Sequence, residues 1–275
     1  MKSRFLLALL LSFQALTAFS HPQIALVDDN VTEEVLATRL RGRIDVDTSS
    51  TSCWAPDYAS NSMPSSRTAC SVEAAKLPHA VEMLDTLKTS SVAFCGICRN
   101  SGLFPALVCA VRSNAPVISI SQSGSFSSSY GRERMVALLQ KMPLVVFAVP
   151  NYGHQGMIAG FVPQAQEMDN VVFAVSVDKK GKFENWVDIS LIPKHGVVFA
   201  TDGTSSTGAT GNSLAAPRIA ELLSELAVQN PEMAGPDLVT LLKKKARRMK
   251  GYDNIYVLPA PKQVASTQKV ATQTN

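Results

Sequence analysis

The chain has 275 residues, of which 46% are hydrophobic and 17% are charged, and its formal net charge is +4. This length and hydrophobic content suffice for one domain with a sizeable core, and the low share of charged residues argues against an intrinsically disordered chain. The nearly balanced charge gives no reason to expect a nucleic-acid partner.

The first 20 residues show the three parts of a secretory signal peptide. Lys2 and Arg4 precede an apolar run, 5–11, and small residues around Ser20 suit a signal peptidase. The alternative is a membrane anchor, but the run is short for that role, and no other stretch is long and apolar enough to span a bilayer. We therefore expect residues 1–20 to be removed, leaving a secreted or periplasmic protein with a net charge of +2.

Seven short runs rich in Val and Ile predict buried β-strands. They are apolar on both alternating faces, as strands of a parallel sheet covered on both sides are. In chain order these runs are 24–27, 91–94, 104–110, 116–121, 144–149, 171–177 and 196–200.

Five segments with apolar residues at helical spacing are interleaved with these strands. They are 31–41, 79–87, 132–141, 213–228 and 236–248, and we interpret the basic run at the end of the last one as a solvated helix end. Strands that alternate with helices predict an α/β domain of three layers, with a mostly parallel central sheet flanked by helices. We expect this domain to span 21–258, with a Ser/Thr-rich loop insertion at 47–67 and a disordered tail at 259–275.

The chain has five cysteines, which fit an exported protein because oxidising compartments permit disulfides. Cys53 and Cys70 bracket a Ser-rich segment and form a plausible pair, and the odd total leaves one cysteine over. Cys95 and Cys98 have the spacing of a redox or zinc half-site, but a second ligand pair is missing, so we interpret both as structural. The pairing of these four and Cys109 stays open.

A possible nucleophile lies in Gly211-Asn212-Ser213-Leu214-Ala215-Ala216-Pro217. It places a hydroxyl at the start of an apolar helix, where backbone N–H groups and the helix dipole favour developing negative charge. The plain alternative is that Ser213 only caps the helix. The segment resembles the nucleophile motif of subtilisin-like serine proteases (subtilases), Gly-Thr-Ser-Met-Ala-Ala-Pro, with Asn and Leu in place of Thr and Met.

That resemblance implies the order Asp, His, Asn, Ser along the chain, and candidates for the first two follow it. Asp28 ends the first apolar strand, as the family's orienting acid does, with Asp29 next and Asn30 in place of the usual Gly. His79 lies 51 residues later at the start of a helical pattern. It matches the family's His-Gly-Thr-His-Val-Ala-Gly loosely, since Glu82 replaces the second His, but no other His lies between Asp28 and Asn151.

The resemblance also assigns an oxyanion donor and a substrate groove. Asn151 follows the strand 144–149 in Pro150-Asn151-Tyr152-Gly153 and resembles the family's Ala-Gly-Asn-x-Gly, although an Asn-x-Gly turn is the plain alternative. Ser121, Gln122 and Ser123 stand where the family binds its extended substrate.

The resemblance, which spans about residues 24–250, implies a secreted serine endopeptidase that cleaves protein or peptide substrates through an acyl-enzyme intermediate. We expect a monomer with no cofactor and no metal, since no acidic cluster marks a calcium site. One alternative is a subtilase-fold binding protein whose catalysis has decayed. The altered surroundings of His79 and the lack of room for a propeptide ahead of residue 24 favour it. An α/β-hydrolase is remote, because Ser213 lacks the second Gly of Gly-x-Ser-x-Gly and no His follows it.

Overall fold

The computed structural model describes residues 22–29, 45–47, 79–88, 91–97, 103–121, 129–151 and 162–259. The predicted signal peptide, the helix 31–41, residues 48–67 of the loop insertion and all of the tail beyond Pro259 lie outside these ranges.

The described residues build one central β-sheet whose strands come from the whole length of the domain. Its order is β2-β3-β1-β4-β5-β6-β7-β9-β8, and all neighbours are parallel except β8 and β9. In chain order the strands are β1 (Ile24–Asp29), β2 (Asp45–Asp47), β3 (Ser91–Ile97), β4 (Val117–Ile120), β5 (Val145–Ala148), β6 (Val171–Ser176), β7 (Val197–Thr201), β8 (Arg247–Arg248) and β9 (Ile255–Val257). This confirms the mostly parallel sheet that the apolar runs predict.

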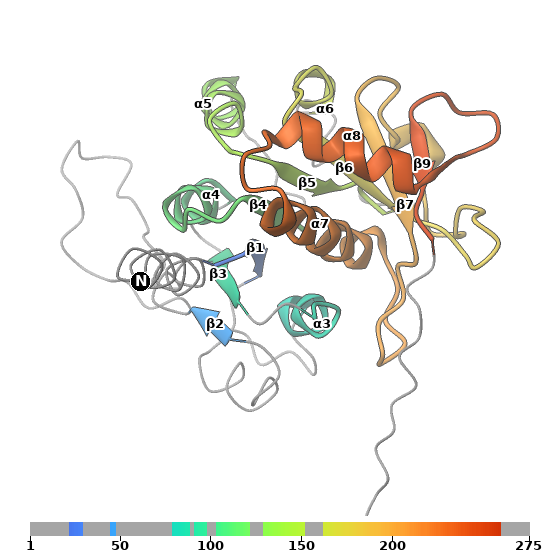
Figure 1. Ribbon diagram of the computed structural model, residues 1–275, viewed down its shortest axis with the longest axis horizontal. Coiled ribbons are helices and arrows are strands. Elements are labelled where there is room, and N and C mark those ends of the chain that lie inside the picture. The colour runs from blue at the N-terminus through green and yellow to red at the C-terminus, as the bar shows by residue number, and fades with distance from the viewer. Residues whose placement is uncertain are drawn as a thin grey trace, which may run out of the picture.

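Two hydrophobic cores cover the two faces of the sheet, which makes the domain three-layered. On β1, Ala25 and Val27 face one core while Ile24 and Leu26 face the other, as the alternation of side chains along a strand requires. The first core includes side chains of α4 (Leu103–Arg112), α5 (Ser129–Leu139) and α6 (Val162–Ala165). The second includes side chains of α3 (His79–Asp85), α7 (Asn212–Gln229) and α8 (Gly235–Lys245). In Figure 1, α7 and α8 cross in front of the sheet.

The predicted strand 104–110 is wrong, because this run lies in helix α4. The buried residues of α4 are Leu103, Ala106, Leu107 and Ala110, which have helical spacing and form the stripe that packs on the sheet. Pro105 does not prevent the helix, because it stands in the first turn, where a backbone N–H has no intrahelical partner.

The last predicted helix is too long by three residues. Helix α8 ends at Lys245, and Arg247 and Arg248 pair with β9 as the short edge strand β8. The basic run therefore divides between a helix end and a sheet edge. The extended backbone of Ala246 (φ −101°, ψ 159°) marks the change.

A disulfide joins Cys95 of β3 to Cys109 of α4, with 5.8 Å between their Cα atoms. Cys95 is therefore not paired with Cys98 in a redox motif, which agrees with the structural role expected for it. Cys53, Cys70 and Cys98 lie outside the described residues. No helix among the described residues has the length and hydropathy to cross a membrane.

The candidate residues lie at the carboxyl ends of the central strands. β1 lies between β3 and β4, so the connection from β3 through α4 to β4 passes over β1. In open α/β sheets, ligand sites form outside the carboxyl ends of the strands where the strand order reverses. Asp28 is the last residue but one of β1, and Ser121 and Asn151 follow β4 and β5 at the same end of the sheet.

Candidate active site

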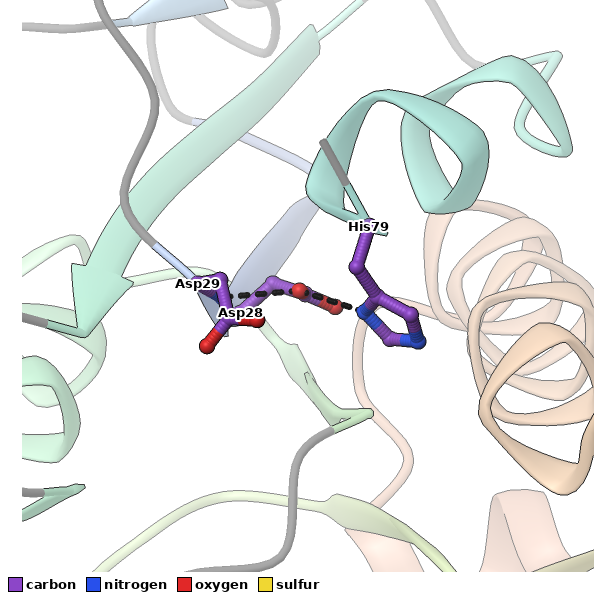
Figure 2. Close-up of side chains that lie close together, drawn as sticks. All are labelled: Asp28, Asp29 and His79. Atoms are coloured by element: carbon purple, nitrogen blue, oxygen red, sulfur yellow. Dashed lines mark hydrogen bonds and ion pairs between the residues drawn. The ribbon is translucent and has the colours of Figure 1, made fainter. Parts of the chain in front are cut away.

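The acid and the base predicted from the sequence lie in direct contact. Nδ1 of His79 donates to Oδ1 of Asp28 at 2.7 Å (Figure 2). The backbone N–H of Asp29 donates to the same oxygen at 2.7 Å. Because an ionised carboxylate can only accept hydrogen bonds, Nδ1 carries the proton, and a neutral imidazole then has its lone pair on Nε2. In Figure 2, Nε2 points away from both carboxylates, so this nitrogen is placed to accept a proton from elsewhere.

The positions of these two side chains follow from the elements that carry them. Asp28 is fully buried near the end of β1, between two neighbouring strands. His79 is the first residue of α3, and the apolar side chains that follow it, including Met83 and Leu84, anchor this helix on the core. The imidazole keeps 31% of its surface exposed, which leaves it accessible to a substrate.

Charge around His79 controls its pKa. Burial opposes protonation of the imidazole, but the adjacent Asp28 carboxylate outweighs it, with further help from Asp29 and Glu82, and the pKa of His79 rises to about 8. The pKa of Asp29 is also raised, because burial and the charge of Asp28 disfavour a second carboxylate so close by. A neutral imidazole, which is the form that can act as a base, therefore predominates only above about pH 8.

Asp28, Asp29 and His79 could also be considered as metal ligands, since one ligand atom of each lies within 4.8 Å of the others. However, the 2.7 Å between Nδ1 of His79 and Oδ1 of Asp28 is a hydrogen-bond distance, and both atoms are engaged with one another. The arrangement is that of an acid–base pair, in which a buried carboxylate orients an imidazole.

Ser213 lies at the second position of α7 and is buried, with 9% of its surface exposed. The N-cap of α7 is Gly211, which has no side chain, so Ser213 does not cap the helix. The hydroxyl is therefore not committed to the capping role that its sequence also allows. Its position in the first turn places it where backbone N–H groups converge and where the helix dipole favours negative charge.

Side-chain atoms of Asn151 and Ser213 both border Gly211. A methyl group at Gly211 would lie 3.1 Å from Nδ2 of Asn151 and 3.1 Å from Oγ of Ser213, so only a residue without a side chain fits there easily. The Asn151 amide is oriented, because its Oδ1 accepts the backbone N–H of Asn212 at 2.9 Å. Nδ2 is then the donor end of the amide, and it lies nearer than Oδ1 to a methyl group placed at Gly211, at 3.1 Å against 3.7 Å.

The segment ahead of α7 contacts the helix that carries His79. Residues 203–211 fold back on themselves, with Gly211 N–H donating to the carbonyl of Gly203 at 2.9 Å. From this turn, Oγ of Ser206 donates to Asp85 at 2.5 Å and Oγ1 of Thr207 donates to Glu82 at 3.2 Å. Both acceptors are on α3, so the elements bearing His79 and Ser213 are tied at this point.

Arg218 holds the same turn from within α7. Its guanidinium donates to the backbone carbonyls of Asp202 and Thr204, each at 2.5 Å, and pairs with the Asp202 carboxylate at 3.1 Å. The planar fork of donors in a guanidinium suits such multiple acceptors, and a lysine lacks this fork. The turn that leads into Ser213 is thus fixed from the helix that follows it.

Of the predicted groove, only Ser121 is described. It directly follows β4, its N–H donates to the carbonyl of Val27 at 3.3 Å, and its hydroxyl is buried without a partner among the described residues. It therefore lies beside the strand that carries Asp28. Gln122 and Ser123 lie outside the described residues.

The comparisons with known proteins place the fold. No family model and no curated protein matches the sequence. Among solved structures, the A-subunit of the AB5 toxin from E. coli has 16% identity and a TM-score of 0.59, with 87% of this chain and 90% of that chain covered. A cold adapted subtilisin-like serine proteinase has 16% identity and a TM-score of 0.53, with 86% and 87% covered. The prenylagaramide maturation protease PagA has 14% identity and a TM-score of 0.53, with 86% and 88% covered.

These similarities show that the chain has a subtilisin-like fold, as the motifs predict. Sequence reasoning nevertheless missed one residue of the site. The motif gives Asn212 no role beyond replacing Thr, whereas in the structure its side chain contacts Ser176 at the end of β6 and Pro150 just beyond β5. The only sign of this role in the sequence is that Asn stands where the family motif has Thr.

Proposed function

We propose that the chain is an exported serine endopeptidase in which Ser213 is the nucleophile, His79 the general base and Asp28 the orienting acid. The observation that carries this proposal is the 2.7 Å contact between the buried carboxylate of Asp28 and Nδ1 of His79. That contact fixes the tautomer that a general base needs, because the proton on Nδ1 leaves Nε2 free to accept. The subtilisin-like fold supports it.

In the proposed reaction, Nε2 of His79 takes the hydroxyl proton as Oγ of Ser213 attacks the carbonyl carbon of a peptide bond. Asp28 stabilises the imidazolium that forms, while the N–H of Ser213 and Nδ2 of Asn151 stabilise the oxyanion. The imidazolium then protonates the leaving amine, and an acyl-enzyme remains. Water, deprotonated by the same imidazole, releases the acid product and restores the hydroxyl.

Ser121, Gln122 and Ser123 are proposed to bind an extended stretch of substrate beside β4. The main-chain groups of such a peptide can pair with those of these three residues as an added strand, which gives affinity without strict sequence preference. Export is proposed from the signal-peptide pattern, and the bond between Cys95 and Cys109 is compatible with an oxidising compartment.

Labelling by a fluorophosphonate tests the proposal, because this probe reacts with a serine only when a base activates it. The unsubstituted, oxidised protein is expected to label covalently, and Ser213→Ala is expected to lose labelling completely. Ser224→Ala is the matched control, since Ser224 lies in the same helix and its hydroxyl binds the carbonyl of Gln23 at 3.1 Å. It should label at the normal rate.

A folded protein that does not label would refute the protease proposal. The decayed, substrate-binding form of the fold would then be the better interpretation. Labelling that persists in Ser213→Ala would assign the reactive serine elsewhere, and peptide mapping of the adduct would identify it.

A further inference from the structure

Asn212 is fully buried and lies between Gly211 and Ser213 at the start of α7. Its carboxamide has an acceptor oxygen and a donor NH2 group, so burying it is costly unless both form hydrogen bonds. Its contacts meet this requirement and connect three separate elements.

The carboxamide of Asn212 reaches the ends of two strands. Its Oδ1 accepts the backbone N–H of Ser176, the last residue of β6, at 2.7 Å. Its Nδ2 faces the carbonyl of Pro150, two residues beyond β5, at 3.4 Å. The Thr that subtilases have here carries one hydroxyl on a shorter side chain, and it could not span both strand ends in this way.

The backbone of Asn212 makes the third contact, and this one orients the oxyanion donor. Its N–H can only donate, so the atom of Asn151 that faces it at 2.9 Å must be the acceptor Oδ1. Nδ2 of Asn151 is thereby the amide atom nearer to Gly211, since a methyl group there would lie 3.1 Å from Nδ2 and 3.7 Å from Oδ1, and also 3.1 Å from Oγ of Ser213. Moving Asn212 would therefore release the orientation of Asn151.

We propose that Asn212 is a positioning residue, which locks the oxyanion donor Asn151 and the nucleophile Ser213 in register with the ends of β5 and β6. This inference rests on the proposed protease function. Asn212 acts through Asn151 and does not itself touch the reacting atoms. Its effect should therefore disappear once Asn151 can no longer donate.

The test is a double-mutant cycle on the rate constant for fluorophosphonate labelling. Asn151→Ala removes one oxyanion donor and should slow labelling by roughly 100-fold or more. Asn212→Thr should slow it by roughly 10-fold, because a displacement of well under 1 Å suffices for such a loss. The double variant should be no slower than Asn151→Ala alone, since coupled residues are not additive.

Asn170→Thr is the matched control for loss of a buried structural amide. Nδ2 of Asn170 donates to the carbonyls of Leu139 and Met142, both at 2.8 Å, at the opposite edge of the sheet from the candidate site. This variant should lower the thermal midpoint without changing the labelling rate. Circular dichroism confirms that each variant is folded.

A second measurement does not depend on reactivity. The side-chain amide proton signals of Asn151, identified by their loss in Asn151→Ala, should shift in the NMR spectrum of Asn212→Thr and stay in place in Asn170→Thr. Unchanged Asn151 signals, or losses in labelling rate that multiply in the double variant, would overturn the positioning role. If the unsubstituted protein does not label, the protease proposal fails. The NMR result alone then decides whether Asn212 orients Asn151.

Discussion

Replacing Asp28 by Asn changes a single group of the acid–base pair while keeping its shape. In the unsubstituted protein, Oδ1 of Asp28 accepts hydrogen bonds from both Nδ1 of His79 and the N–H of Asp29, each at 2.7 Å. If the Asn oxygen takes this place, its NH2 group falls where Oδ2 is buried without a partner among the described residues. If the NH2 group takes it instead, it faces a donor and forces the imidazole into the other tautomer.

Either orientation removes the charge that most favours the imidazolium. Because burial opposes protonation, the pKa of His79 should fall from about 8 toward its ordinary value of 6.5. A raised pKa means that protonated His79 stabilises the fold below about pH 6.5 and that this contribution is lost as the pH rises through about 8. The difference between a pKa of about 8 in the folded state and 6.5 in the unfolded state corresponds to about 2 kcal/mol of folding free energy. Asp28→Asn should therefore destabilise the protein about 2 kcal/mol more at pH 6 than at pH 9.

Labelling by the fluorophosphonate measures the effect on reactivity. Loss of the orienting carboxylate in a Ser-His-Asp protease lowers the rate roughly 10⁴-fold. We expect a loss of this order in Asp28→Asn near pH 8, with circular dichroism showing a folded protein. Urea unfolding at pH 6 and pH 9 measures the stability difference. An unchanged labelling rate, or a stability cost that does not vary with pH, would refute the assigned coupling between the two side chains.

Three further predictions follow from the site and its surroundings. Because only neutral His79 can accept a proton, the labelling rate of the unsubstituted protein should fall as the pH drops through about 8, and a rate independent of pH between 6 and 9 would contradict this. Gly211→Ala brings a methyl group to 3.1 Å from both Oγ of Ser213 and Nδ2 of Asn151, so labelling should slow roughly 10-fold while the thermal midpoint changes little. An unchanged labelling rate would show that Gly211 does not constrain these two side chains. Replacing Cys95 and Cys109 together by Ser opens a link across 14 residues and should lower the free energy of unfolding by roughly 3 kcal/mol in urea, with a loss below 1 kcal/mol arguing against the bond.

Periodicity predicted most of the core elements but could not settle segments that are apolar throughout. The run 104–110 contains several apolar residues in succession, which suits a buried strand as well as a helix. Its buried positions, Leu103, Ala106, Leu107 and Ala110, have helical spacing, but the sequence alone does not show which of its apolar residues are buried. Sequence patterns do not predict β9, because Ile255–Val257 is too short for a pattern, and this strand depends on its pairing with β7 and β8.

The sequence by itself determined the order of the chemical groups, from Asp28 through His79 and Asn151 to Ser213, and the type of element that ends or begins at each one. These properties are local, since a strand end or a helix start depends on neighbouring residues. Only the tertiary structure decided that Asp28 meets His79 across 51 residues and that Asn212 ties β6 and the end of β5 to the start of α7. Hydrogen bonds between segments so far apart depend on strand order and helix packing, which the spacing of residues along the chain does not encode.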